Sequence, residues 1–304
     1  MKKHPLLAYF GILAFLSALV IGIIYGMGQK GMYFAQIYML IPAISAIITR
    51  LFFYEKRFAN AHLKLGKAKD WLKFWFISAC LAILSYLFFT LFGAVEWDFS
   101  GQAFLDKLAA QFAEAGQSME NTLPPWLTPH KMLLLYAIGS LTLFNILPGL
   151  ITGMGEEFGH RGLMFTLWAE INLKKALVFG GLVWFAWHLP LALIMPVKQE
   201  LSGAEQILNA VVLSTGSVFT HIYLAFVLMK SRSIWITALA HISFNNVSTA
   251  LSFFVVITDQ TLANLGLVLT MVFAVVIGIW KFNFWQTLTG EKQPPKPEIN
   301  TFIQ

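Results

Sequence analysis

The segment Ala176–Pro196 reads ALVFGGLVWFAWHLPLALIMP, a run without any Asp, Glu, Lys or Arg. A predominantly apolar run of about 20 residues is long enough to cross the hydrocarbon core of a bilayer as a helix. Similar runs occur elsewhere in the chain, at Pro5–Met27, Tyr33–Leu51, Leu72–Ala94, Met132–Ile151, Ile207–Met229, Ile234–Val255 and Leu262–Ile279. The sequence therefore predicts an all-α, polytopic membrane protein with about eight transmembrane helices.

The overall composition supports the same class. The chain is 58% hydrophobic and 12% charged, and its mean hydropathy is +0.69. A soluble globule of this composition would expose a large apolar surface. Transmembrane strands are only about 10 residues long and alternate in polarity, so the longer apolar runs exclude a β-barrel.

The distribution of Lys and Arg predicts the orientation, because basic residues concentrate in cytoplasmic loops. With the N-terminus in the cytoplasm, the basic residues that face outward are only Lys30, Lys107, Lys131 and Lys198, out of 21. An even number of spans returns the C-terminus to the same side. We therefore expect both termini in the cytoplasm, and the basic run Tyr54–Lys73 on anionic lipid headgroups. Lipid contact explains the positive charge without a nucleic-acid partner.

The chain is expected to form a single transmembrane helical domain over residues 1–283, followed by a flexible, proline-rich cytoplasmic tail over residues 284–304. The first span is too long for a typical signal peptide and is expected to remain. In the outer segment Val95–Lys131, apolar residues recur at helical spacing, which indicates a short interfacial helix. This segment is either a connector or a lid. Cys80 is the single cysteine, so disulfides and zinc–thiolate sites are excluded.

Three clusters of ionisable and amide residues lie in or beside the apolar runs. They are the segments EEFGHR at Glu156–Arg161, WFAWH at Trp184–His188 and HISFN at His241–Asn245. Such side chains are costly in hydrocarbon and indicate a functional site by default. Carboxylates, imidazoles, an amide and a guanidinium are also the groups that activate a water and stabilise an oxyanion.

The first cluster predicts a pair of carboxylates in different environments. If Gly155–Trp168 is helical, Glu156 lies beside His160 and Glu157 lies beside Arg161, four residues along the same face. A carboxylate held by arginine stays ionised, whereas one in a drier setting suits a general base. The alternative is an ion pair at a helix end on the cytoplasmic surface. Close backbone or substrate approach is indicated by the glycines Gly153, Gly155, Gly159 and Gly162.

The other two clusters also place polar side chains four residues apart. His188 shares a helix face with Trp184, and His241 shares one with Asn245. Each of these pairs is either part of a catalytic site or a source of interhelical hydrogen bonds. His221 has no motif around it and is interpreted as a structural histidine.

Taken together, the three clusters resemble the CAAX protease and bacteriocin-processing family of intramembrane proteases, which includes type II CAAX prenyl endopeptidase. The family pattern is Glu-Glu-x-x-x-Arg, then Phe-x-x-x-His, then His-x-x-x-Asn. This chain has Glu156-Glu157-x-x-x-Arg161, Trp184-x-x-x-His188 and His241-x-x-x-Asn245. The resemblance covers roughly residues 150–250. It departs at Trp184, where the family usually has Phe.

The resemblance implies a role for each matched residue. Glu156 would activate the attacking water together with His188, and Glu157 and Arg161 would support that arrangement. The remaining matched residues would act on the substrate: His241 and Asn245 would stabilise the tetrahedral oxyanion, and Trp184 would line the substrate groove.

The three motifs are compatible with a reaction with or without a metal ion. The motifs suffice for a metal-free, glutamate-based reaction without any cofactor, which is our expectation. The alternative is a catalytic zinc held by Glu156, His188 and His241.

The sequence thus predicts an intramembrane endopeptidase of the plasma membrane. Its expected partners are membrane lipids and a peptide or protein substrate, with or without a lipid modification. Two other readings are a membrane scaffold that binds a peptide partner without cleaving it, and an ion-coupled transporter, for which buried ionisable residues are equally natural.

One expectation conflicts with this function. If the fourth span ends near Ile151, Glu156 lies at the cytoplasmic edge, and His188 lies about 18 Å deeper at 1.5 Å per residue. A break at Pro148-Gly149 would carry the following helix back toward the core, which is tolerated where the backbone lines a wet cavity.

Overall fold

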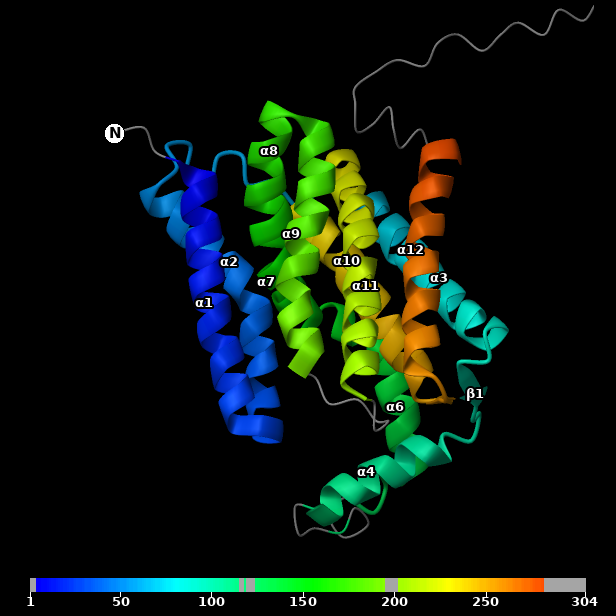
Figure 1. The fold of residues 1–304 in the computed structure, drawn as a ribbon. Helices are drawn as coiled ribbons and strands as arrows, with labels where there is room; N and C mark the ends of the chain where they lie inside the picture. Colours follow the sequence, from blue (N-terminus) through cyan, green and yellow to red (C-terminus); the bar gives the residue numbers. More distant parts are fainter. Residues whose placement is uncertain (1–3, 115–117, 119–123, 195–201, 282–304) are drawn as a thin grey trace, which may run out of the picture.

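The structure, a computed structural model, describes residues 4–114, 118, 124–194 and 202–281, and it is a bundle of helices (Figure 1). The α-helices are α1 (Pro5–Met27), α2 (Ala35–Phe52), α3 (Ala68–Leu91), α4 (Gln102–Glu114), α6 (Pro129–Leu141), α7 (Gly149–Gly159), α8 (Thr166–Ile171), α9 (Leu173–Ile194), α10 (Gly203–Ser231), α11 (Ile234–Ser252) and α12 (Gln260–Lys281). Two 3₁₀ segments, η1 (Gly28–Phe34) and η2 (Leu143–Asn145), and one π-helical segment, η3 (His160–Phe165), connect or continue them. The predicted all-α class is confirmed.

Within the described residues, six helices are long and apolar enough to cross a membrane, namely α1, α2, α3, α9, α10 and α12. A seventh candidate is the broken pair Pro129–Leu141 and Leu143–Ile171, which is bent by 44°. Helix α11 does not count among them, because His241 and two asparagines lower its hydropathy. The chain is therefore a multi-pass membrane protein, and the count of eight spans and the location of the termini stay predictions.

The fourth span differs from its prediction. An uninterrupted helix over Met132–Ile151 is wrong, because α6 ends at Leu141 and α7 begins only at Gly149. Thr142 leaves the helical conformation at the end of α6. Pro148 then disfavours regular helix over residues 144–148, since proline lacks the N–H of an interior helical residue and its ring clashes with the preceding turn. From Gly149 onward the chain is helical through η3 to the end of α8, so the predicted helix over Gly155–Trp168 is confirmed.

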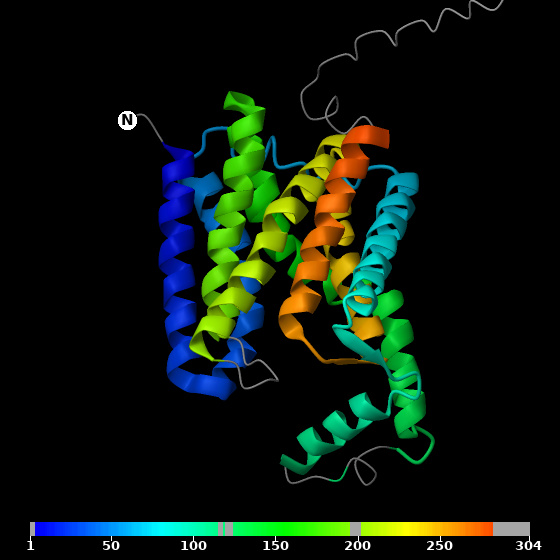
Figure 2. The ribbon, with the colours of Figure 1, turned by 45° about the vertical axis from the view of Figure 1, so that its right-hand side comes forward.

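The outer segment forms a helix and a small sheet. Strand β1 (Val95–Trp97) pairs antiparallel with β2 (Val255–Ile257), with Glu96 opposite Val256. The predicted short helix is α4, which lies across one end of the bundle (Figure 2). Its residue Leu105 packs against Leu133 of α6. Residues 115–117 and 119–123, and the predicted tail over residues 284–304, lie outside the described residues.

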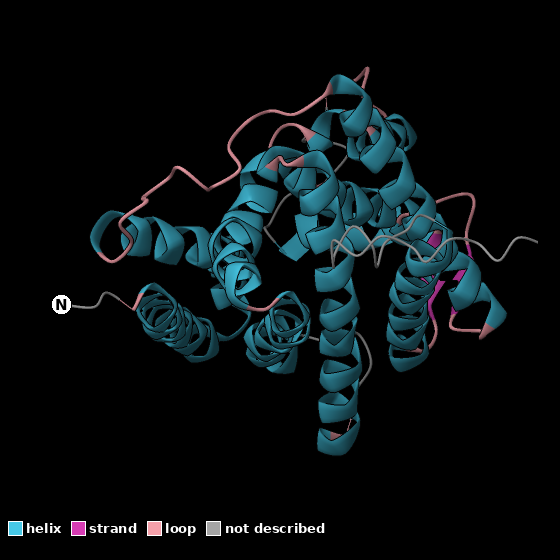
Figure 3. Cartoon of the chain, turned by 90° about the horizontal axis from the view of Figure 1, so that it is seen from above, coloured by secondary structure: helices cyan, strands magenta, loops and turns pink. Residues whose placement is uncertain are grey.

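Helix α7 occupies the interior, packed between α2 and α11. Its glycines permit this contact: a Cβ atom at Gly155 would lie 2.6 Å from the carbonyl oxygen of Met39, and one at Gly159 would lie 2.4 Å from that of Pro42. The close backbone approach predicted from the glycines is therefore confirmed. Seen from above, the two strands lie at one edge of the bundle (Figure 3).

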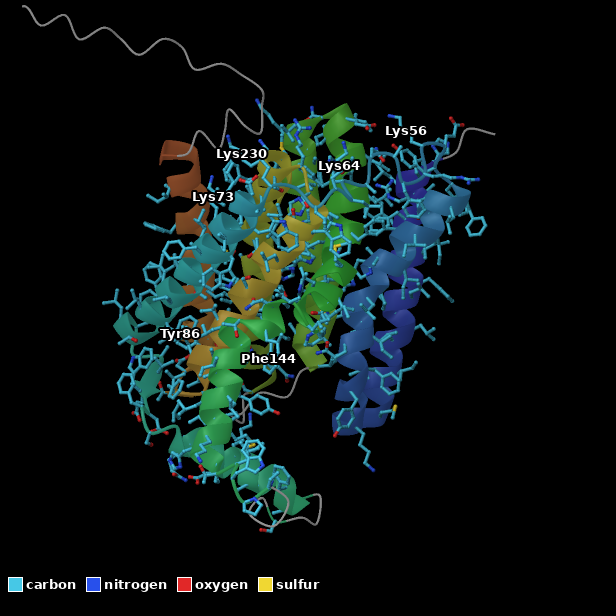
Figure 4. All side chains as sticks on the ribbon, turned by 180° about the vertical axis from the view of Figure 1, so that it is seen from behind. Lys56, Lys64, Lys73, Tyr86, Phe144 and Lys230 are labelled. Atoms are coloured by element: carbon cyan, nitrogen blue, oxygen red, sulfur yellow. The ribbon has the colours of Figure 1, made fainter. Side chains whose placement is uncertain are left out.

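Basic side chains gather at one end of the molecule. Lys56, Lys64, Lys73 and Lys230 all lie at the end opposite α4 (Figure 4). This arrangement agrees with the expected orientation, which places these four residues in the cytoplasm.

Candidate active site

The Glu157 carboxylate is held by the side chains of Arg161 and His241. Arg161 Nη1 lies 3.0 Å from Glu157 Oε1, four residues along the helix as the spacing predicts. His241 Nδ1 lies 2.9 Å from the same oxygen, and it must be the donor because an ionised carboxylate only accepts hydrogen bonds. Glu157 and Arg161 are both fully buried. Glu157 therefore joins α7, η3 and α11.

The other carboxylate has a different environment. Trp184 Nε1 donates a hydrogen bond to Glu156 Oε2 at 3.2 Å. His188 Nε2 lies 3.8 Å from that oxygen, and His188 Nδ1 lies 2.9 Å from the carbonyl oxygen of Trp184. Because a carbonyl oxygen only accepts, Nδ1 carries the proton in the neutral ring, and Nε2 is the basic nitrogen that faces Glu156.

The expected separation of about 18 Å between Glu156 and His188 is therefore wrong. That expectation treated the fourth span as one helix that ends near Ile151. The chain bends by 44° at the break and then continues as helix to Ile171, well past Ile151. Ile171 follows Glu156 by 15 residues, and His188 follows Leu173, the first residue of α9, by 15 residues. The two side chains therefore lie at similar distances from the α8–α9 connection, where they meet across the two helices.

Trp184 lies at the centre of the site. The Arg161 guanidinium carbon is 3.8 Å from the centre of its ring, which is a cation–π contact. The rings of His188 and His241 meet it edge to face, with centroids 5.0 and 5.4 Å away. The departure from Phe at this position adds the indole N–H that Glu156 accepts, a bond that Phe cannot make.

A cavity of about 280 Å³ opens onto this group. The polar side chains that line it are Glu156, Trp184, His188, His241 and Asn245, together with Ser217, Thr220 and Tyr223 of α10. Apolar side chains of α9, α10 and α12 form much of the rest. Glu156 is almost buried, whereas the side chain of His188 is 27% exposed, so the cavity reaches Glu156 past the imidazole.

The segment that carries the three motifs matches a known family model. Residues 138–247 match the family model of type II CAAX prenyl endopeptidase, Rce1-like. The match covers less than half of the chain but includes all three motifs, and it confirms the resemblance. A comparison with curated proteins gives no match.

His160 and His221 lie near the three motifs but make no hydrogen bond to Glu156 or Glu157 in the described part of the chain. His160 does not bond to Glu156, and its ring packs against Trp187 with centroids 5.2 Å apart. Neither ring nitrogen of His160 has a hydrogen-bond partner among the described residues. His221 Nε2 lies 3.2 Å from the carbonyl oxygen of Ala176, an interhelical contact that supports its interpretation as structural.

In the described part of the chain, no group of three His, Cys, Asp or Glu side chains is placed to hold a metal ion. The alternative zinc ligands Glu156, His188 and His241 thus do not form such a group there. The bond from His241 Nδ1 to Glu157 leaves His241 Nε2 open, as in many metal-binding histidines. Metal dependence itself stays open to measurement.

Sequence reasoning missed two contributions from α2, which lies outside the Rce1-like segment. Tyr38 donates a hydrogen bond to the carbonyl oxygen of Trp187 at 2.6 Å and stacks on its ring, with centroids 4.7 Å apart. Arg50, which the charge rule counts on the cytoplasmic side, is fully buried against η3. The available signal was a lone arginine inside the apolar run Tyr33–Leu51.

Proposed function

We propose that this protein is an intramembrane endopeptidase that cleaves a peptide bond by direct attack of an activated water. The observation that carries the proposal is the unequal environment of two adjacent carboxylates. Glu157 is neutralised by Arg161 and His241. Among the described residues, the polar partners of Glu156 are a tryptophan N–H and a partly exposed imidazole, and Glu156 faces the cavity. Such a difference assigns different roles to paired carboxylates.

In this reaction Glu156, with His188, removes a proton from a water in the cavity as the water oxygen attacks the scissile carbonyl carbon. The carbonyl oxygen then carries negative charge. His241 and Asn245, which line the same cavity, stabilise that oxyanion by hydrogen bonding. Asn245 donates through its amide, and His241, whose Nδ1 already donates to Glu157, donates through Nε2 in its protonated form. When the tetrahedral intermediate collapses, the C–N bond breaks and the proton passes to the leaving amine.

The proposed substrate is a peptide or protein segment, with or without a lipid modification, cleaved at the plasma membrane. The Rce1-like match supports this substrate class. Trp184 is proposed as a wall of the substrate groove. We propose that no metal is used, and measurement of zinc in the purified protein tests that point, because stoichiometric zinc would contradict it.

The test compares peptide termini in membranes that contain equal amounts of wild type, Glu156→Ala or His188→Ala. We expect new termini with the wild type and none with either variant, because each variant removes one of the two groups that activate water. Cleavage near the wild-type level by either variant would overturn the proposal.

The same experiment separates the other readings. A scaffold would retain its bound partner equally in wild type and Glu156→Gln, with no change in termini. A transporter would lose ion or solute flux in Glu156→Ala without any peptide cleavage.

A further inference from the structure

Arg50 is a buried arginine whose contacts reach the active-site helix. It lies near the end of α2 and has no exposed surface. Its Nη2 donates to the carbonyl oxygen of Gly162, and its Nη1 donates to the carbonyl oxygen of Arg57 and, at 3.0 Å, to Asn60 Oδ1. The guanidinium also lies 5.8 Å from the centre of the Phe158 ring. Among the described side chains, no carboxylate forms an ion pair with it.

The acceptor in η3 lies in an unusual turn. In a π-helix the backbone bonds span five residues, and single π-turns inside α-helices occur frequently at functional sites. Here the π-turn begins at His160 and includes Arg161, the partner of Glu157. Two of its carbonyl oxygens accept side-chain bonds: Thr166 Oγ1 donates to that of Arg161 at 2.9 Å, and Arg50 donates to that of Gly162.

A buried charge that is partnered only by neutral groups is costly, and apolar residues of similar volume frequently replace such groups without loss of stability. We propose that Arg50 is a positioning residue, which holds the π-turn so that Arg161 keeps Glu157 in place. This inference rests on the proposed function for its catalytic consequence. The inference that Arg50 fixes the π-turn rests only on its hydrogen bond to the Gly162 carbonyl oxygen.

Arg50 also connects the turn to the loop over residues 53–67. That loop is bonded to the start of α11, since the Ile234 N–H donates to the carbonyl oxygen of His62 at 2.9 Å and Trp235 Nε1 donates to that of Leu63 at 3.0 Å. Burial lowers the pKa of His62, and the positive charges of Arg232 and Arg50 lower it further. One guanidinium thus joins α2, the loop and η3.

The first test measures peptide cleavage by Arg50→Gln, Arg50→Lys and Thr166→Val. We expect Arg50→Gln to lower kcat by about 10- to 100-fold with little change in KM, because small displacements of reactive groups reduce rates by such factors. Arg50→Lys should recover part of the loss, and Thr166→Val, which removes the other side-chain bond to the turn, should lower kcat as well.

Arg57→Gln is the matched control. It removes a positive charge from an exposed side chain next to Arg50 and keeps the Arg57 carbonyl oxygen that accepts from Arg50.

The second test needs no cleavage assay. Amide hydrogen exchange in detergent should speed up by at least tenfold at residues 160–166 in Arg50→Gln or Thr166→Val, relative to wild type and Arg57→Gln, while exchange in α12 stays unchanged. Unchanged exchange at the turn, or a raised KM with unchanged kcat, would overturn the positioning role. If the wild type shows no cleavage that depends on Glu156, the proposed function fails, but the exchange result still decides whether Arg50 holds the turn. If Arg50→Gln does not fold, Arg50→Lys decides both readouts, since it keeps the charge but cannot make all the hydrogen bonds of the guanidinium.

Discussion

At the scale of single residues, the site depends on two neighbouring carboxylates that the helix directs to different partners. Glu157 lies between Arg161 and His241, and all three side chains are buried or nearly so. Among the described residues, Glu156 accepts the Trp184 N–H alone and lies next to His188. Glu157 is therefore bound into a structural ion pair, whereas Glu156 keeps an oxygen for chemistry.

This division predicts unequal losses of stability for two isosteric variants. Glu157→Gln leaves the Arg161 charge buried without its counter-ion, and breaking a buried ion pair in this way costs about 3–5 kcal/mol. In Glu156→Gln the amide oxygen still accepts the Trp184 N–H, so the stability loss should stay below about 1 kcal/mol. Denaturant unfolding in detergent measures both. Equal destabilisation by the two variants would contradict the division of roles.

At the scale of elements, the position of α7 depends on backbone contact with α2. The residues Gly155 and Gly159 face carbonyl oxygens of α2 at distances that leave no room for a side chain. The dense glycines in the sequence predicted such an approach, but they did not identify α2 as the partner. Spacing along one helix reveals neighbours within that helix, whereas a contact between distant segments leaves no comparable periodic signal.

A pair of alanine substitutions tests this contact. A methyl group at Gly159 would overlap the Pro42 carbonyl oxygen, whereas one at Gly162 would meet nothing closer than 3.5 Å. We expect Gly159→Ala to lower the free energy of unfolding by about 1–3 kcal/mol through overpacking. The matched control Gly162→Ala should change it by less than about 1 kcal/mol, since alanine also favours helix. Thermal unfolding of the two purified variants gives the comparison, and equal midpoints would exclude the proposed close packing.

At the scale of the whole molecule, hydropathy predicted most spans and the all-α class, because the bilayer imposes long apolar helices. It missed the continuation of the fourth span to Ile171, which brings Glu156 to the depth of His188, because the ionisable side chains of residues 156–161 lower the local hydropathy. Motif spacing predicted the pairing of Glu157 with Arg161. It missed the bond from His241, 84 residues away, because residues on separate helices meet only through tertiary packing.

The N-terminal helices also contribute more than their composition suggested. Arg50 and Tyr38 belong to α2, outside the matched segment, yet both contact the segments that carry the motifs. The charge rule only counts Arg50 on the cytoplasmic side and gives no information on its burial. The site is therefore a product of the whole bundle and not of the three motifs alone.

The most direct measurement is cleavage by purified protein of a peptide that spans a site found in the membrane comparison. Wild type and Glu156→Gln would be assayed at equal folded concentration, with folding checked by unfolding midpoint. We predict turnover by the wild type and a loss of at least about 1,000-fold in Glu156→Gln, since the amide cannot accept the proton from water. Turnover by Glu156→Gln within tenfold of wild type would contradict the central claim that Glu156 activates the attacking water.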